Sequence, residues 1–227
     1  MLTLMPSARL SRGWPRLLSA SLLLLAVVGC ETAYVATMEK LGVEKRDILV
    51  DRVTEARDAQ EDAKEQFASA LEEFSAVTSF DGGDLEKLYN RLNSEFERSE
   101  DRARAVRDRI EAVESISERL FDEWSEEITQ YTSASLRRSS EAQLRDTKRR
   151  YDTLVASMWR AEARIAPVLD AYRDQVLYLK HNLNARAIAS LRGELTSIES
   201  DVAVLVREME VAIAESNDFI AQMQTDG

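Results

Sequence analysis

The sequence predicts an all-α protein whose long antiparallel, heptad-patterned helices form an elongated four-helix bundle or coiled-coil rod. Three observations support this fold class. The 227 residues include only 7 Gly and 3 Pro, but 31% are charged, which favours long uninterrupted helices over turn-rich sheets. Four stretches of the chain repeat their apolar residues in alternating steps of three and four. Hydrophobic residues make up 44% of the chain, which is sufficient for a buried core.

The first 29 residues have the composition of an export signal. Residues 1–16 carry three Arg and no acid, and an apolar run from Leu17 to Val28 follows them. A helix of this run is roughly 18 Å long, too short for the ~30 Å core of a bilayer. The run is therefore typical of a signal peptide and not of a membrane span, and we expect residues 1–29 to be removed.

The single cysteine of the chain follows this segment directly. Val27-Val28-Gly29-Cys30 resembles the lipobox of bacterial lipoproteins, with an aliphatic residue at −3 and a small residue at −1. The resemblance implies that Cys30 receives fatty acyl chains of the palmitate type and becomes the first residue. The alternative is cleavage elsewhere, which leaves a free thiol. Glu31, in place of Asp, implies sorting to the outer membrane with the chain facing the periplasm, and residues 30–42 would be the acylated cysteine and its tether.

The remaining residues, 43–227, are expected to form one elongated helical domain. Its first helix covers about 43–80, and Gln60 is the one polar member of its regular seam. That seam consists of Leu49, Val53, Ala56, Gln60, Ala63, Phe67, Ala70, Phe74 and Val77. The stretch Asp81-Gly82-Gly83-Asp84 ends it, because glycine permits positive φ and Asp84 can cap the next helix.

Three more helices are expected, at about 85–131, 139–180 and 186–223. Their turns fall at the small polar residues 132–135 and near Asn182 and Asn184. Pro167 should kink the third helix at the preceding turn. Extra apolar residues should widen the buried face of the fourth helix, which favours a bundle over a two-stranded coil: Val204, Val206, Val211, Ile213 and Ile220.

The up-and-down order predicts which turns share an end. If the chain starts at a membrane, the turns at 81–84 and 180–186 lie far from it. The turn at 131–140 and the C-terminus then lie near it. The sequence leaves open whether the helices form one bundle or two hairpins, and whether chains self-associate through their heptads.

Charge and residue usage disfavour several function classes. Removal of residues 1–29 leaves 27 basic and 41 acidic groups, a net charge of −14, which disfavours nucleic-acid binding. One Cys and one His cannot make an internal disulfide or a multi-Cys/His metal site. Asp81, Asp84 and Glu86 lack the spacing of a calcium loop. No phosphate-binding, serine-hydrolase or zinc-protease motif is present, so we expect no enzyme activity, cofactor, metal or small-molecule substrate.

Two clusters are candidate contact sites. A basic segment, expected near the membrane, offers possible lipid contacts, although it also reads as a solvated helix start: Arg137, Arg138, Lys148, Arg149 and Arg150, with Arg145 between them. The second is a polar turn, which either caps and packs the hairpin or docks a partner: Lys180, His181, Asn182 and Asn184. A hydrolytic site around His181 is a third class of hypothesis, with no companion residues to support it.

Four strings carry a family resemblance: MEKLGVEKRDILVDRV, FDGGDLEKLYN, SASLRRSSEAQLR and LKHNLNARAIASL. They resemble an uncharacterised family of Gram-negative helical lipoproteins, domain of unknown function 2959, over essentially all of residues 31–225. The resemblance implies an exported all-helical protein and supplies no activity, substrate or catalytic residue.

We therefore expect a non-enzymatic, lipid-anchored envelope protein, a helical spacer, scaffold or partner-binding module in the periplasm. The alternative is a peripheral membrane-binding protein, active in membrane remodelling or stress, that uses the basic segment 137–150. A continuous basic face would favour this alternative, and the acidic composition argues against it.

Overall fold

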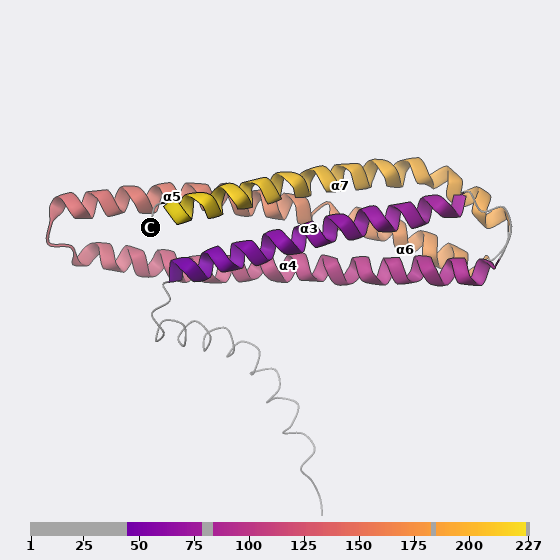
Figure 1. Cartoon of the computed structure of the whole chain (residues 1–227), viewed down its shortest axis with the longest axis horizontal. Coiled ribbons are helices and arrows are strands. Elements are labelled where there is room, and N and C mark those ends of the chain that lie inside the picture. Colours follow the sequence, from indigo (N-terminus) through magenta and orange to yellow (C-terminus); the bar gives the residue numbers. More distant parts are fainter. Residues whose placement is uncertain (1–44, 79–83, 183–184, 226–227) are drawn as a thin grey trace, which may run out of the picture. The chain divides into compact units, whose positions relative to one another are not determined.

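A computed structural model describes residues 45–78, 84–182 and 185–225, and all long elements in them are helices (Figure 1). The helices are α3 (Lys45–Thr78), α4 (Leu85–Gln130), α5 (Ala134–Glu162), α6 (Ile165–His181) and α7 (Ala185–Thr225). No strand occurs in these described ranges, so the predicted all-α class is confirmed. Cys30, Glu31, the expected signal and tether (residues 1–42), the glycine turn and Asn184 lie outside the described residues.

The helices form one bundle, whose ring order is α3, α4, the α5–α6 pair and α7. The backbone of α3 runs beside those of α4 and α7, and α5 and α6 each run beside α4 and α7, whereas α3 meets α6 through core side chains, with Phe67 and Phe74 against Tyr172. The α5–α6 pair is thus diagonally opposite α3. This arrangement excludes two separate hairpins, an alternative that the sequence alone left open.

The seam of α3 is buried along its whole length. All nine predicted positions from Leu49 to Val77 have exposed fractions of 4% or less. Gln60 is fully buried with them, and neither its amide nitrogen nor its amide oxygen has a hydrogen-bond partner among the described residues. Asp84 caps α4 as expected, since its Oδ1 accepts from the backbone N–H groups of Glu86 and Lys87. Those bonds lower the pKa of Asp84, the bond from Lys87 contributing most.

The predicted third helix is two helices in the structure. It starts at Ala134, five residues before the expected start, because Ser133 caps it and the turn shrinks to residues 131–133. It then breaks at Ala163 and Arg164, within the turn before Pro167. The proline ring clashes with the carbonyl four residues earlier, which belongs to Ala163. The buried seam nevertheless keeps its spacing across the break, through Met158, Ala161, Ile165, Val168 and Tyr172.

The fourth helix buries a narrower face than predicted. Its regular seam is buried from Ile188 to Met223, with Leu195 half-buried. Of the extra apolar residues, Val211 is 42% exposed and the other four are only half-buried. Helix α3 flanks α7 on one side and the α5–α6 pair flanks it on the other, so positions at the side of the seam stay in contact with solvent.

The α4–α5 hairpin extends beyond α3 and α7 at one end of the bundle (Figure 1). Lys45, the first residue of α3, places its Nζ 2.5 Å from Glu123 of α4. Arg46 donates to the backbone oxygen of Met223, near the end of α7. The described parts of α3 and α7 thus stop near the level of Glu123. We call residues 118–130 of α4 and 134–150 of α5 the hairpin end.

Candidate functional site

The hairpin end has a small core of its own. Phe121, Ile128 and Leu144 are buried there, and Leu120, Trp124 and Tyr151 pack against them. The rings of Phe121 and Tyr151 meet edge to face at 5.3 Å, and Trp124 Nε1 donates to Ser140 Oγ at 2.8 Å. Burial raises the pKa of Tyr151. The hairpin end is therefore a packed structure and not a frayed pair of helices.

The basic segment lies on this packed hairpin, and most of its side chains have local partners. Arg137 donates to the backbone oxygen of Tyr131 at 2.6 Å, and Lys148 lies 5.3 Å above the ring of Phe121. Arg149 pairs with Asp146 at 2.7 Å, and Arg150 also makes contacts. Arg138 is exposed and forms no ion pair with the described residues. These basic residues thus lie on one helix, and most of them already interact with other groups of the chain.

Two large apolar side chains are exposed at the same place. Leu136 in the first turn of α5 is 58% exposed, and Tyr131 in the connecting turn is 39% exposed. Tyr131 follows Trp124 by seven residues, a spacing that predicts a place on the buried face of α4. It is exposed because α3 and α7 end before they reach it, so no described helix covers that side of the turn.

The polar cluster at the opposite end is a helix end. Lys180 and His181 close α6, and the backbone N–H of Asn182 donates to the Leu179 oxygen. The Asn182 side chain donates to the Tyr178 oxygen at 2.9 Å. The described part of this cluster therefore caps the helix, which agrees with the structural role weighed for it. Asn184, its fourth member, is outside the described residues.

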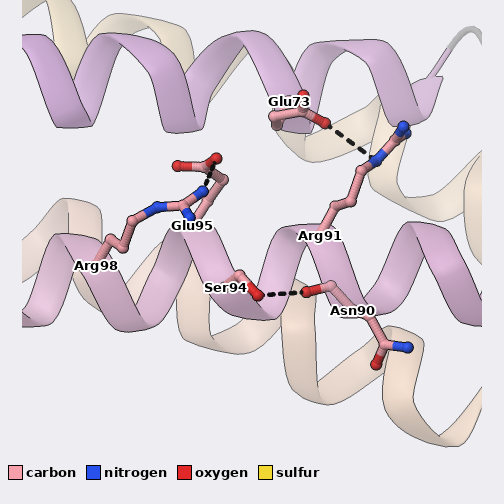
Figure 2. A pocket seen from close by; sticks show the side chains of 6 residues that line it. All are labelled: Glu73, Asn90, Arg91, Ser94, Glu95 and Arg98. Carbon is pink, nitrogen blue, oxygen red and sulfur yellow. Dashed lines mark hydrogen bonds and ion pairs between the residues drawn. The ribbon is translucent and has the colours of Figure 1, made fainter.

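A cleft between α3 and α4, which the sequence reasoning missed, has a volume of about 360 Å³. Its lining side chains reach across it from both helices (Figure 2): Glu73, Asn90, Arg91, Ser94, Glu95 and Arg98. Arg91 Nε lies 3.4 Å from Glu73 Oε2, an ion pair without hydrogen-bond geometry. Glu95 is 8% exposed and is held by Arg98 and by Gln66 Nε2 at 2.7 Å. One sequence signal existed, because Glu95 continues the seam spacing of Leu88, Leu92 and Ser99.

The chemistry of this cleft is that of an ionic contact between helices. Two carboxylates face two guanidinium groups, so their charges compensate and no net field is left for a ligand. Among the described residues, no three His, Cys, Asp or Glu side chains gather closely enough to hold a metal ion.

Ion pairs and hydrogen bonds also join α4 to its other neighbours. Arg107 binds Glu162 of α5, with Nε at 2.9 Å, and this bond raises the pKa of Arg107. Trp159 Nε1 donates to Glu114 at 3.0 Å. Toward α3, Arg102 pairs with Asp62 and Arg109 pairs with Glu55, both at 2.8 Å. These contacts identify which side of α4 faces each neighbour.

Comparison with known proteins identifies the family. The family model described as Protein of unknown function (DUF2959) matches residues 34–223, which include every described helix except the last two residues of α7. The chain belongs to this family. No curated protein and no solved structure matches it. None of the described helices of this DUF2959 protein has a stretch that is long and apolar enough to cross a membrane.

Proposed function

We propose that this DUF2959 protein is a non-enzymatic lipoprotein of the outer membrane, anchored through Cys30, whose helical bundle serves as a periplasmic scaffold. The anchor is supported by the apolar run that ends in Val27-Val28-Gly29-Cys30. The outer-membrane location is supported by Glu31, because Asp at this position is the residue associated with retention in the inner membrane.

The observation that supports the scaffold role best is that almost the whole chain after Cys30 is committed to one core. Residues from Lys45 to Gly227 make a single compact unit, and its seam residues are buried from one end to the other. The residues between Cys30 and Lys45 span at most about 50 Å when extended. Such a bundle holds its surfaces in fixed relative positions and can present them to a partner within that reach.

Cell fractionation tests the anchor and its place together. The wild-type protein should be found in the outer-membrane fraction, and Cys30→Ser should abolish lipid labelling of the chain by radioactive palmitate. Glu31→Asp should move the protein to the inner membrane. A wild-type protein that is released from membranes by salt alone would overturn the anchored scaffold.

The partner of such a scaffold remains to be captured. We propose the end formed by Lys180, His181 and Asn182 as one docking place, since Lys180 and His181 are exposed and α6 ends there, far from the start of α3. A photoreactive amino acid at position 181 should crosslink a reproducible envelope protein in vivo. Crosslinks to lipid alone, or no crosslink at all, would contradict this docking place.

A second function, direct contact with anionic lipid, is favoured by one observation. Leu136 and Tyr131 are exposed at the hairpin end beside Arg137 and Arg138, and each basic residue near anionic lipid adds about 1 kcal/mol. The adjacent end of α4 opposes it, because five acids and one base lie on residues 118–130. Changing Arg137, Arg138, Lys148, Arg149 and Arg150 to Gln should weaken binding of the unacylated chain to anionic liposomes, and unchanged binding removes this function.

A further inference from the structure

The hairpin end separates charge between its two helices. Residues 118–130 of α4 carry five acids and one base, whereas residues 134–150 of α5 carry six bases and two acids. The net charges of the two halves, −4 and +4, cancel, so the hairpin end as a whole attracts neither an anionic nor a cationic partner strongly. A partner with the same separated pattern, turned so that opposite signs meet, would be attracted along its whole length.

Many of these charges form no ion pair with another described residue. On α4, Glu118, Asp122 and Glu126 are exposed and form no ion pair with the described residues. The same holds for Arg138 and Arg145 on α5. In the part of the chain that the structure describes, these side chains are available to another molecule.

The charges also oppose the dipoles of their own helices. Acids near the C-terminus of α4 and bases in the first turns of α5 meet like partial charges. Favourable helix electrostatics would place the opposite signs at both ends. The separation therefore needs an explanation other than the stability of α4 and α5 as single helices.

The acidic row of α4, which consists of Glu118, Asp122 and Glu126, lies on the outer face of the hairpin. Glu114 of α4 faces α5, since it binds Trp159. Each step of four residues turns a helix by about 40°. Glu118, Asp122 and Glu126 therefore move progressively from the α5 side of α4 toward solvent, away from Arg102 and Arg109, which face α3.

The basic row of α5, which consists of Arg138, Arg145 and Arg149, lies on the same outer face. On α5, Lys148 and Trp159 face α4. Arg138, Arg145 and Arg149 are spaced by seven and four residues, which puts them on one exposed stripe of α5. This stripe points away from the buried Thr147 and Leu154, so it borders the acidic row across the hairpin.

The two rows also coincide in height along the bundle. Trp124 binds Ser140, and Phe121 lies against Lys148. Arg145, between Ser140 and Lys148, is therefore level with Asp122, between Trp124 and Phe121, and Arg138 is level with Glu126, since both lie two residues beyond the contact of Trp124 with Ser140. A second copy can be rotated by 180° about an axis parallel to the helices. Each of its residues then stays at the same height along the bundle, but α4 and α5 exchange places. The acidic row of the second copy would therefore face the basic row of the first.

We propose that the hairpin end pairs with a second copy of this chain in a parallel two-fold dimer. In it, Arg145 of each copy lies opposite Asp122 of the other copy and Arg138 lies opposite Glu126, and both bundles point the same way. The antiparallel two-fold arrangement would place α4 on α4 and α5 on α5, so like charges would meet. The proposal is independent of the lipid anchor, although two chains held in one membrane would pair more readily.

The dimer should be weak and sensitive to salt. Two helices about 20 Å wide together, over roughly 25 Å of length, offer about 500 Å² per copy, which is at the low end for a specific interface. Exposed ion pairs are individually weak and are screened by salt. We therefore expect reversible pairing that weakens at least tenfold between ionic strengths of about 0.02 M and 0.5 M.

A charge-exchange experiment tests the proposal. The chain from Glu31 onward is suitable, because residues from Lys45 form a compact unit with their own core. Asp122→Lys with Glu126→Lys makes one variant, and Arg138→Glu with Arg145→Glu makes the other. Sedimentation equilibrium at low salt should show about tenfold weaker self-association for each variant, since like charges then face each other in both halves of the dimer.

The mixture of the two variants gives the decisive reading. Each variant complements the other in both halves, so the mixture should associate about as tightly as the wild type, which also shows that both variants are folded. Glu72→Lys with Glu199→Lys, exposed acids on α3 and α7, is the matched control and should associate like the wild type. A wild type that stays monomeric at low salt, or a mixture no tighter than its separate components, overturns the proposal.

Discussion

Gln60 is the residue whose burial is hardest to explain by stability. Its nine-membered seam is otherwise apolar, and both polar atoms of its amide are buried without a partner. A buried, unpaired polar group costs the free energy of its lost hydration. A polar group in a heptad seam is known to fix helix register at the expense of stability, which is the role that we infer for Gln60.

Replacing this side chain should therefore stabilise the protein. Gln60→Leu removes the unpaired amide and keeps the volume, so we expect the free energy of unfolding to rise by about 1–3 kcal/mol. Urea denaturation followed by circular dichroism measures the change. Gln66→Leu is the matched control and should lower stability, because Gln66 donates to the buried carboxylate of Glu95. A loss of stability in Gln60→Leu would show that Gln60 has a partner in solution.

Tyr172 links the aromatic core to the backbone. Its ring stacks on Phe74 at 4.5 Å, and its hydroxyl donates to the backbone oxygen of Phe67 at 3.0 Å. Burial, followed by the nearby charge of Glu95, raises the pKa of Tyr172 well above its ordinary value. The folded protein therefore keeps a proton that the unfolded chain loses above about pH 10.

This difference predicts a loss of stability in alkali. Because the unfolded state binds fewer protons, the free energy of unfolding should fall as the pH rises above about 10. Tyr172→Phe should cost about 1 kcal/mol at pH 8 through the lost hydrogen bond, and should then lose less stability than the wild type between about pH 10 and 11. Denaturation curves at these pH values measure both effects. Equal losses of stability in the two proteins would contradict the assigned burial of the phenol.

At the scale of the element, the break between α5 and α6 is a local effect of Pro167. The seam spacing continues through it, so the core does not require an interruption there. Arg164 donates to the Ala161 oxygen in a tightened turn, and the carbonyl of Ala163 cannot receive a hydrogen bond from a proline nitrogen. We infer that the sequence of the core would accept a continuous helix from Ala134 to His181.

Pro167→Ala tests this inference. The new amide at position 167 can bond the Ala163 oxygen, so the amides of residues 164–168 should exchange hydrogen at least about tenfold more slowly. Hydrogen exchange resolved by nuclear magnetic resonance measures it, with residues 150–155 of α5 as the internal reference. Unchanged exchange at residues 164–168 would mean that packing, and not the proline, imposes the break.

The sequence predicted buried faces well and ends of elements poorly. The positions from Leu49 to Val77 were correct because period and burial are properties of one helix. The early start of α5 depends on Ser133 as a cap, although Ser135 and Ser139 are capping residues of the same kind nearby. The exposure of Tyr131 and the cleft at Glu95 depend on how far neighbouring helices extend. The apolar pattern of one helix does not predict where its neighbours end.

At the scale of the whole molecule, the helices from Lys45 onward form one compact unit with two different ends. The start of α3, the end of α7 and the hairpin end lie together, and the end of α3, the start of α4, the end of α6 and the start of α7 lie at the opposite end (Figure 1). The sequence predicted this grouping of ends from the up-and-down order. It could not predict the ring order, because the same seams also fit two separate hairpins.

The central claim is that this bundle is held at a membrane through Cys30, which lies outside the described residues and stays a prediction. The most direct measurement is the intact mass of the protein after detergent extraction from its own cell envelope. We predict a chain that begins at Cys30 and carries the added mass of three fatty acyl chains. A chain that begins at another residue, or one with an unmodified Cys30 thiol, would contradict the claim.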